Sequence, residues 1–546
     1  LALLAALVLM DGRAAIAQGG GNYRPFSVPM GHILSRAREA EPIVYTYHWD
    51  KYLDLYYDSA GQPAAFVPAG DEPTTIDKVE ATAREVLADA GSAWLVMYPS
   101  KLKPEIVQAG FNRAGYPTEM TWFGGGRGVA RYFSERDVAG QSGGAVWADR
   151  YRLNRWWASE PTVTAGDALR LQFEWQNLAP GSESDGSEAD RPLPLVLLTL
   201  VGPDGQAWAT RLGAPCGEGS DRPCRPEGWR EPVLDRQAFY VPLDTPPGAY
   251  TLRVAWLTPD GETMLVRTPD DDAPQGAMTL LDVTIDPPRQ AAAKEAPLAI
   301  PSGLETAGAG LTLLSFSQPT EPVLAGSTVV LPMQWQVHAA QSPLEVELRL
   351  ERQGETWSSA QPAGPQWYGS DRWTAGRLVR AQPQFKLRGT LAPGEYAASL
   401  IVSRADGSGS ILTAPLNPVV IKDRERRFDV PPEGEPVNVA WQEGVQLVRA
   451  TIPDRGVSGE TLPVTLVWQA DRPTAGNWKV FVHLVDDQGA PIAQGDAYPL
   501  GGTALTTTWQ PGEVLVDTYP IRLPADLSPG TYRLNIGFYD EATDER

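Results

Sequence analysis

The two cysteines are the first residues of this chain whose spacing points to a definite chemistry. Cys216 and Cys224 are the only cysteines among 546 residues, and a short polar loop separates them. A disulfide between them would restrict the unfolded chain and stabilise the fold by roughly 2.6 kcal/mol if it is unstrained. The alternative is a pair of reduced surface thiols. If the disulfide forms, this part of the chain lies in an oxidising compartment.

Two further clusters could bind ions. The glycine-rich run from Gly124 to Gly128 could cradle a phosphate, but that chemistry requires the loop to open a helix. The residues that follow, 129–133, have the pattern of a strand, so the run is predicted to be a hairpin turn. Three consecutive acidic residues, Asp270 to Asp272, could hold calcium through their oxygens. Because no second acidic cluster is spaced to join them, a solvated loop is predicted instead.

No catalytic, cofactor-binding or metal-binding residue is predicted. The sequence contains no Gly-x-Ser-x-Gly elbow, no His-Glu-x-x-His helix and no Cys/His nucleophile arrangement. A carboxylate pair for glycoside hydrolysis depends on a separation in space, and the sequence singles out no pair. The formal net charge of −21 repels phosphates, so nucleic acid is not expected as a partner.

The elements that must position any site are β-strands, because one pattern recurs three times. In each copy a glycine is followed nine residues later by Trp-Gln, with apolar residues at alternate positions between them. The copies run from Gly166 to Trp175, from Gly326 to Trp335 and from Gly459 to Trp468. Side chains alternate faces along a strand, so these apolar residues and the tryptophan share one face. Each tryptophan is therefore predicted to lie in the core of a sandwich.

Three further markers follow in the same order in every copy. They are a hairpin glycine, a second tryptophan, and a Pro-Gly-x-Tyr turn. The glycines are Gly205, Gly354 and Gly489, the tryptophans are Trp229, Trp373 and Trp509, and the tyrosines are Tyr250, Tyr396 and Tyr532. The turn resembles the tyrosine corner of immunoglobulin-like sandwiches. The three tyrosines are therefore predicted to be structural core residues.

These patterns predict a multidomain, mostly β chain. A small α/β domain spans residues 21–140, with helices at 51–58, 75–90 and 104–114 alternating with strands at 43–48, 64–67 and 93–98, before a hairpin at 119–133. Three immunoglobulin- or fibronectin-III-like antiparallel β-sandwiches follow, at 146–288, 300–424 and 436–546. The third is predicted to be truncated, lacking its last strand and leaving an edge unpaired.

The first residues predict a membrane association. Leu1 to Met10 is an unbroken apolar run, and residues 1–20 are expected to be the end of a transmembrane helix or a signal segment. The tripeptide from Ala15 to Ala17 fits the cleavage site of a signal peptide. Either alternative places the bulk of the chain outside the cytoplasm, with the membrane at its N-terminus.

Parts of the sequence resemble a known family. The stretches that carry the resemblance are Glu41 to Tyr45, Tyr56-Tyr57 and Trp94 to Pro99 in the α/β domain, and Val480 to Leu484, Ile492 to Asp496 and Trp509 to Glu513 in the third sandwich. The first set resembles the extracytoplasmic segment after the last helix of bacterial polytopic glycosyltransferases in the dolichyl-phosphate-mannose-protein mannosyltransferase superfamily. The second set is similar to tail sandwiches on such proteins. The resemblance implies an enzyme that takes sugar from a polyprenyl-phosphate donor, but the family's acidic catalytic residues match no part of this chain.

Two functions follow as expectations. The chain is the non-catalytic, extracytoplasmic C-terminal region of such a membrane glycosyltransferase, whose sandwiches position or bind a glycan or an envelope polymer. The alternative is a secreted or membrane-anchored, non-enzymatic surface protein whose sandwiches bind carbohydrate or act as spacers. Exposed aromatic rings would carry sugar contacts by stacking. The candidates are Trp156, Trp157, Trp367 and Tyr368, and one member of each adjacent pair is expected to be buried.

Overall fold

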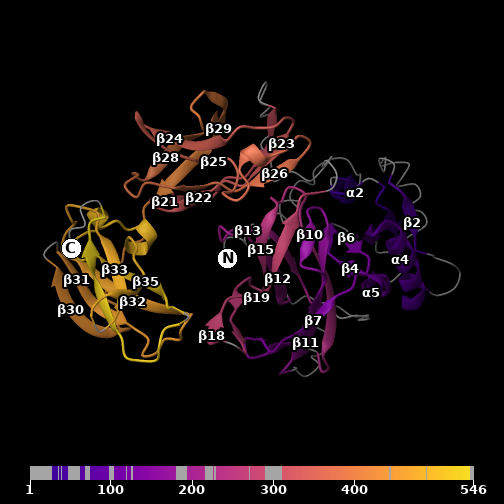
Figure 1. Cartoon of the computed structure of the whole chain (residues 1–546), viewed down its shortest axis with the longest axis horizontal. Coiled ribbons are helices and arrows are strands. Elements are labelled where there is room, and N and C mark those ends of the chain that lie inside the picture. The colour runs from indigo at the N-terminus through magenta and orange to yellow at the C-terminus, as the bar shows by residue number, and fades with distance from the viewer. Residues whose placement is uncertain are drawn as a thin grey trace.

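The computed structural model of the chain describes residues 27–34, 36–38, 40–46, 62–67, 74–97, 104–118, 120–123, 127–179, 193–215, 226, 229–269, 271–288, 310–441, 444–486, 488–524 and 526–541. They form the multidomain, mostly β fold that the sequence predicts, with a small α/β domain followed by three sandwiches. In Figure 1 the α/β domain and the first sandwich lie side by side, the second sandwich lies above them, and the third lies on the opposite side of the view. The domains thus form an arch.

The α/β domain is built on a mixed sheet. Its strands are β1 (Ile43–Tyr45), β2 (Ala64–Phe66), β3 (Ser92–Met97), β4 (Tyr116–Pro117), β5 (Thr121–Phe123) and β6 (Arg127–Phe133), in the order β2-β1-β3-β6-β4, with β5 beside β6. Strand β1 runs parallel to β2 and β3, and β6 runs antiparallel to β3. Strands β5 and β6 form an antiparallel hairpin, so the glycine-rich run joins two strands and opens no helix.

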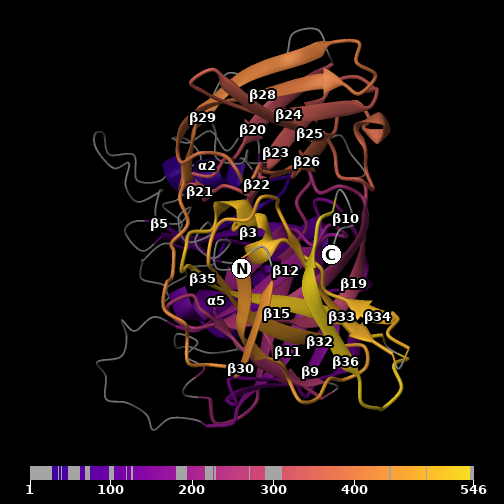
Figure 2. The same cartoon turned by 90° about the vertical axis from the view of Figure 1, so that its left-hand side faces the viewer.

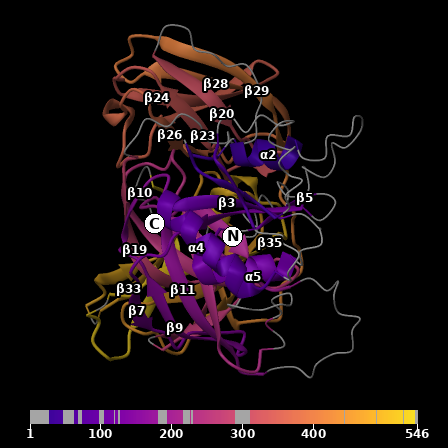
Figure 3. The ribbon, with the colours of Figure 1, turned by 90° about the vertical axis from the view of Figure 1, so that its right-hand side faces the viewer.

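Helices cover both faces of this sheet. Helices α4 (Ile76–Ala90) and α5 (Pro104–Ala114) lie on one face (Figure 3), and α2 (Ser27–Leu34) packs on the other. Helix α4 begins where the Thr75 hydroxyl accepts the Lys78 amide and ends at Gly91, whose φ of 73° is left-handed. The helix expected at 51–58 lies outside the described residues.

A buried ion pair lies where the α/β domain meets the first sandwich. Arg131 donates from Nε to Glu41 Oε1 at 2.7 Å and from Nη2 to Glu41 Oε2 at 2.8 Å. The Arg131 guanidinium also lies 5.1 Å from the ring centroid of Phe133 and 5.2 Å from that of Tyr240, which belongs to the first sandwich. Burial acts to raise the pKa of Glu41, but the charge and hydrogen bonds of Arg131, together with hydrogen bonds from Ser92 and the Arg38 amide, lower the pKa overall. The contacts couple the two domains.

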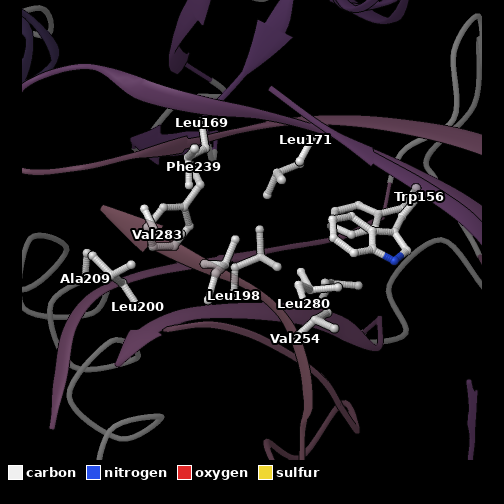
Figure 4. Packing of buried hydrophobic residues seen from close by; sticks show 14 of the residues in the cluster. Trp156, Leu169, Leu171, Leu198, Leu200, Ala209, Phe239, Val254, Leu280 and Val283 are labelled. Atoms are coloured by element: carbon white, nitrogen blue, oxygen red, sulfur yellow. The ribbon is translucent and has the colours of Figure 1, made fainter. Parts of the chain in front are cut away.

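The first sandwich has two facing sheets. One contains β14 (Val233–Tyr240), β11 (Ala168–Asn177), β9 (Tyr151–Ala158), β8 (Val146–Trp147), β17 (Val266–Thr268) and β18 (Asp271–Gln275) in that order, with β7 (Ala139–Ser142) beside β9. The other contains β10 (Thr162–Thr164), β19 (Met278–Asp286), β15 (Gly248–Leu257), β12 (Leu195–Val201) and β13 (Ala207–Gly213), with β16 (Thr263–Met264) beside β15. Figure 4 shows the aliphatic residues of both sheets meeting in one core.

The second sandwich follows the same plan with one interruption. One sheet contains β20 (Leu311–Phe316), β23 (Met333–Val337) and β26 (Leu378–Ala381), and the facing sheet contains β21 (Val323–Leu324), β29 (Ser410–Lys422), β28 (Gly394–Arg404), β24 (Leu344–Arg352) and β25 (Glu355–Pro362). The repeat that starts at Gly326 was expected to form one strand, but it is divided into β22 (Thr328–Val330), which pairs with β27 (Gln384–Lys386), and β23. Pro332 lies between them, and proline has no N–H for the ladder.

One sheet of the third sandwich has fewer strands than the corresponding sheets of the first two sandwiches. Strands β30 (Glu435–Trp441), β31 (Val445–Thr451), β32 (Thr461–Ala470) and β35 (Val514–Arg522) form one sheet, and β34 (Pro491–Gln494), β33 (Lys479–Val485) and β36 (Arg533–Tyr539) form the other (Figure 2). Among the described residues, β36 pairs only with β33.

Contacts of short loops join the second and third sandwiches. Lys386 donates from Nζ to the Gly501 carbonyl at 2.6 Å. Arg424 and Arg426 follow the last strand of the second sandwich, and both pair with Glu513, whose side chain is 0% exposed. The distance from Arg426 Nη1 to Glu513 Oε2 is 2.7 Å. The segment between these sandwiches is thereby held on the surface of the third.

The repeat residues lie in corresponding places. Trp175, Trp335 and Trp468 are each 0% exposed, and Tyr250 and Tyr396 are each 3% exposed. The hydroxyls of Tyr250, Tyr396 and Tyr532 donate to the carbonyls of Pro246, Ala392 and Ser528, at 2.7, 3.0 and 2.6 Å. Tyr532 corrects the expectation of a core residue, because it is only partly buried. Tyr532 directly precedes β36 and packs against the core of the third sandwich with part of its side chain exposed.

Candidate functional site

The strongest candidate site lies where the first sandwich meets the second. A loop before β15 and the two prolines after β19 come from the first sandwich, while the short 3₁₀ helix η3 (Ser370–Arg372) and the residues leading into β26 come from the second. The prolines restrict the backbone of the segments that come from the first sandwich. Together these segments line a partly open cavity of about 370 Å³.

One buried ion pair fixes the two sandwiches together beside this cavity. The Asp244 carboxylate is 0% exposed, and its Oδ2 accepts hydrogen bonds from Arg380 Nε at 3.1 Å and from Gln334 Nε2 at 2.8 Å. Its Oδ1 lies 2.9 Å from Arg380 Nη2. The Arg380 amide also donates to the Asp244 carbonyl at 2.7 Å. Since loss of either member would leave a buried charge unpaired, this junction resists opening.

Trp367 of the second sandwich packs on the tyrosine corner of the first. Its ring centroid lies 5.5 Å from that of Trp208 and 6.1 Å from that of Tyr250. Gly248 leaves the space for it, because a Cβ atom at that position would lie 2.9 Å from Trp367 Cδ1. Burial raises the pKa of Tyr250, so its hydroxyl stays protonated and keeps its corner hydrogen bond.

Two arginines and a tyrosine give the cavity its polarity. The Arg372 guanidinium lies 5.4 Å from the ring centroid of Tyr368, and Arg372 Nη1 donates to the Trp367 carbonyl at 2.6 Å. Arg377 donates from Nη1 to the Pro288 carbonyl. Burial raises the pKa of Tyr368, and the two guanidinium groups oppose that rise. The phenol therefore remains a neutral donor at neutral pH.

A threonine hydroxyl of the same cavity has no partner. Thr245 is 2% exposed, and its Oγ1 forms no hydrogen bond among the described residues. A buried hydroxyl without a partner costs about 1–3 kcal/mol.

The cavity is suited to a small ligand that combines an anionic group with an apolar face. Guanidinium groups pair with carboxylate and phosphate oxygens, and the Tyr368 ring and the prolines offer surface to C–H groups. Asp244 is the one carboxylate among the residues that line the cavity. Because it is paired with Arg380, it is not placed to act as a general base.

The four aromatic residues proposed for sugar contact have different environments. Trp156 is 5% exposed and lies in the core of the first sandwich (Figure 4), which corrects its assignment as a contact residue. Trp157 is partly buried beside Arg155, whose guanidinium lies 5.6 Å from its ring. Trp367 is corrected as well, since it packs between two sandwiches, while Tyr368 lines the cavity.

The other predicted sites lie largely outside the described residues. Both cysteines of the proposed disulfide and Asp270 are outside them, and the side chains of Asp271 and Asp272 are outside them too. Within the described part of the chain, no group of three or more His, Cys, Asp or Glu residues is placed to hold a metal ion. In that same part, no helix is long and apolar enough to cross a membrane.

Sequence reasoning missed three residues of the junction cavity. Thr245, Arg372 and Arg377 stand in no motif, and more than 120 residues separate Thr245 from the two arginines. The only sequence signal nearby is the run of prolines before the corner glycine. It predicts a stiff turn, but it does not say what the turn faces.

Comparisons with known proteins give no family. No family model and no curated protein matches the chain. Among solved structures, it is similar to a DUF4785 family protein from Legionella pneumophila, at 11% identity and a TM-score of 0.15, over 55% of this chain and 62% of that one. It is also similar to a marsupial T cell receptor, at 10% identity and a TM-score of 0.13, over 70% of this chain and 98% of the receptor. Likenesses this weak carry no argument about function.

Proposed function

We propose that the chain is a non-catalytic binding region outside the cytoplasm, carried by a membrane glycosyltransferase that uses a polyprenyl-phosphate sugar donor. Its sandwiches hold a glycan or an envelope polymer near that enzyme. The observation that carries the binding part is the junction cavity, with the Tyr368 ring, two arginines and the unpaired Thr245 hydroxyl. The glycosyltransferase setting rests on the sequence resemblance alone.

The lining of the cavity favours an acidic saccharide. A sugar ring presents C–H groups that can contact Tyr368, and a carboxylate or phosphate on it can approach Arg372 and Arg377. A neutral glycan would use only the first contact. We therefore expect glycans with an acidic group to bind more tightly than neutral ones.

Titration of the full chain with acidic and neutral oligosaccharides tests this proposal. Arg372 is exposed, so Arg372→Gln should leave the fold intact and weaken acidic ligands about tenfold or more, as expected for loss of a charge-assisted hydrogen bond. The matched control is Trp157→Ala, which removes the other partly exposed candidate ring and should leave binding unchanged. If no acidic glycan binds, or if Trp157→Ala alone abolishes binding, the cavity is not the site.

The alternative is a secreted or anchored spacer, and the junctions favour it specifically. Two of the junctions are joined by ion pairs with a buried carboxylate, Asp244 with Arg380 and Glu513 with Arg424 and Arg426, and the α/β domain is joined to the first sandwich by the more exposed pair of Arg136 and Asp167. Such contacts hold the arch at one curvature. A failed glycan titration combined with an unchanging small-angle scattering profile from low to high salt would support the spacer.

The coding sequence upstream of Leu1 separates the two settings, since further membrane segments with an acidic pair in the first external loop are expected only for the enzyme.

A further inference from the structure

The junction cavity has two walls, and each sandwich supplies one of them. The first wall, from the first sandwich, contains the loop at 243–247 with Pro287 and Pro288, and the second wall, from the second sandwich, contains Tyr368, Arg372 and residues 377–379. Both arginines that line the cavity belong to the second wall, and most of the first wall is proline. A ligand that fills the cavity therefore contacts both sandwiches.

Polar groups of both walls also hold the two sandwiches together. Asp244 of the first wall accepts hydrogen bonds from Arg380 and Gln334 of the second sandwich, at 3.1 and 2.8 Å. Arg377 of the second wall donates to the carbonyl of Pro288 in the first wall. The side chains that shape the cavity are therefore the same ones that close the junction.

Arg372 depends on the junction through Trp367. Arg372 Nη1 donates to the Trp367 carbonyl at 2.6 Å. The Trp367 ring packs on Trp208 and Tyr250 of the first sandwich, at centroid distances of 5.5 and 6.1 Å. The carbonyl that positions Arg372 thus belongs to a residue whose side chain the first sandwich holds. Separation of the sandwiches would disturb this arginine as well as the shape of the cavity.

A ligand between the walls adds contacts without displacing those of the junction. A guanidinium has five N–H donors, and Arg372 uses Nη1 for the Trp367 carbonyl, so its other donors can approach an anion. The Asp244 carboxylate is 0% exposed and stays paired with Arg380. A ligand that contacts both walls binds the closed junction more tightly than the open one, and it must stabilise the closed junction by the same free energy.

We propose that the junction cavity is a clamp between two domains, in which an acidic saccharide bridges the first and second sandwiches and holds their junction closed. The charged group of the saccharide lies against the arginines of the second wall, and its C–H groups lie against the prolines of the first. This inference rests on the proposed function, because it concerns the same site. It adds the effect of occupancy, which is to fix the angle between the two sandwiches.

Amide exchange of the full chain with a glucuronic acid disaccharide tests the clamp. The Arg380 amide donates to the Asp244 carbonyl across the junction at 2.7 Å. At a disaccharide concentration about ten times the dissociation constant, exchange that requires the ligand to leave slows about tenfold. The control is the Val514 amide, which donates to the Arg427 carbonyl at 2.7 Å where the second sandwich meets the third. Its exchange rate should not change.

The outcomes distinguish this inference from the proposed function. If the disaccharide binds but exchange of the Arg380 amide is unchanged or faster, one sandwich alone holds the ligand, and the clamp is wrong while the proposed function survives. If the Val514 amide slows as much as the Arg380 amide, the ligand does not act on this junction, and the clamp is again wrong. If the disaccharide does not bind, both proposals fail.

Two variants show whether the ligand contacts the first wall. Pro287 is exposed and lines the cavity, so Pro287→Asp should leave the fold intact and weaken disaccharide binding at least about tenfold by repulsion between like charges. Thr284→Asp is the matched control, because Thr284 is exposed on β19 and does not line the cavity. Its affinity should be unchanged. Equal affinity of Pro287→Asp and the unmodified chain would mean that only the second wall holds the ligand, and the clamp would be wrong.

Discussion

The Asp244→Asn substitution alters the first inter-sandwich junction with almost no change of shape. It leaves the Arg380 guanidinium, whose side chain is 16% exposed, without its counter-charge. It also replaces a carboxylate oxygen that accepts from both Arg380 Nε and Gln334 Nε2. Loss of one member of a buried pair costs about 3–5 kcal/mol. Since 1.4 kcal/mol is a factor of ten, the junction should open roughly 10² to 4 × 10³ times more often.

Amide hydrogen exchange measures how often this junction opens. The Arg380 amide donates to the Asp244 carbonyl across the junction, so its exchange rate reports how often the two sandwiches separate locally. The control is Glu347→Gln in the second sandwich, which removes the more exposed pair between Glu347 and Arg349 at 3.0 Å. That change should cost less than about 1 kcal/mol and leave the Arg380 amide unaffected.

Two outcomes would refute the reasoning about this junction. The first is a rise of less than about fivefold in the exchange of the Arg380 amide, which corresponds to under about 1 kcal/mol. The second concerns the double variant Asp244→Asn with Arg380→Met. Because it removes the orphaned charge, it should exchange more slowly than Asp244→Asn alone. Equal or faster exchange would mean that the buried charge is not the cause.

Three further predictions concern packing, pH and the corners. Gly248→Ala puts a methyl group 2.9 Å from Trp367 Cδ1, and the overpacking should cost about 1–3 kcal/mol in chemical denaturation. Burial lowers the pKa of His32 to about 3, so the unfolded chain binds a proton that the folded chain rejects. Stability should therefore fall by about 1.4 kcal/mol per pH unit as the pH drops from 6.5 toward 3, and His32→Gln should flatten that slope in urea titrations. Tyr396→Phe removes a buried corner hydrogen bond and should lower stability by about 0.5–1.5 kcal/mol, while Tyr532→Phe, at a partly exposed corner, should have a smaller effect on the melting temperature.

The strands of the sandwiches could be read from the sequence because their signal is local. Alternation of apolar residues with period two defines the inner face of a strand wherever it lies in the chain. This is why the three repeat tryptophans lie at 0% exposure. The same reasoning failed at Pro332, where a missing N–H divides a strand that the apolar pattern shows as continuous.

The sequence could not predict in the same way which of the candidate sugar-contact rings are buried. Trp156 and Trp157 are neighbours on β9, and the alternation rule says only that one of them faces inward. Trp367 is covered by Trp208 and Tyr250, which belong to another domain. No local pattern in the second sandwich indicates that its partner surface lies more than 100 residues earlier in the chain.

The sequence by itself determined the order of the domains, the inward faces of their strands and the tyrosine corners, because each of these depends on residues close together in the chain. Only the tertiary structure decided which carboxylates pair across the junctions and where the cavity with Thr245 and Arg377 lies. Those properties depend on segments brought together by packing between domains, and the free energy of such contacts has no counterpart in the periodicity of a single strand.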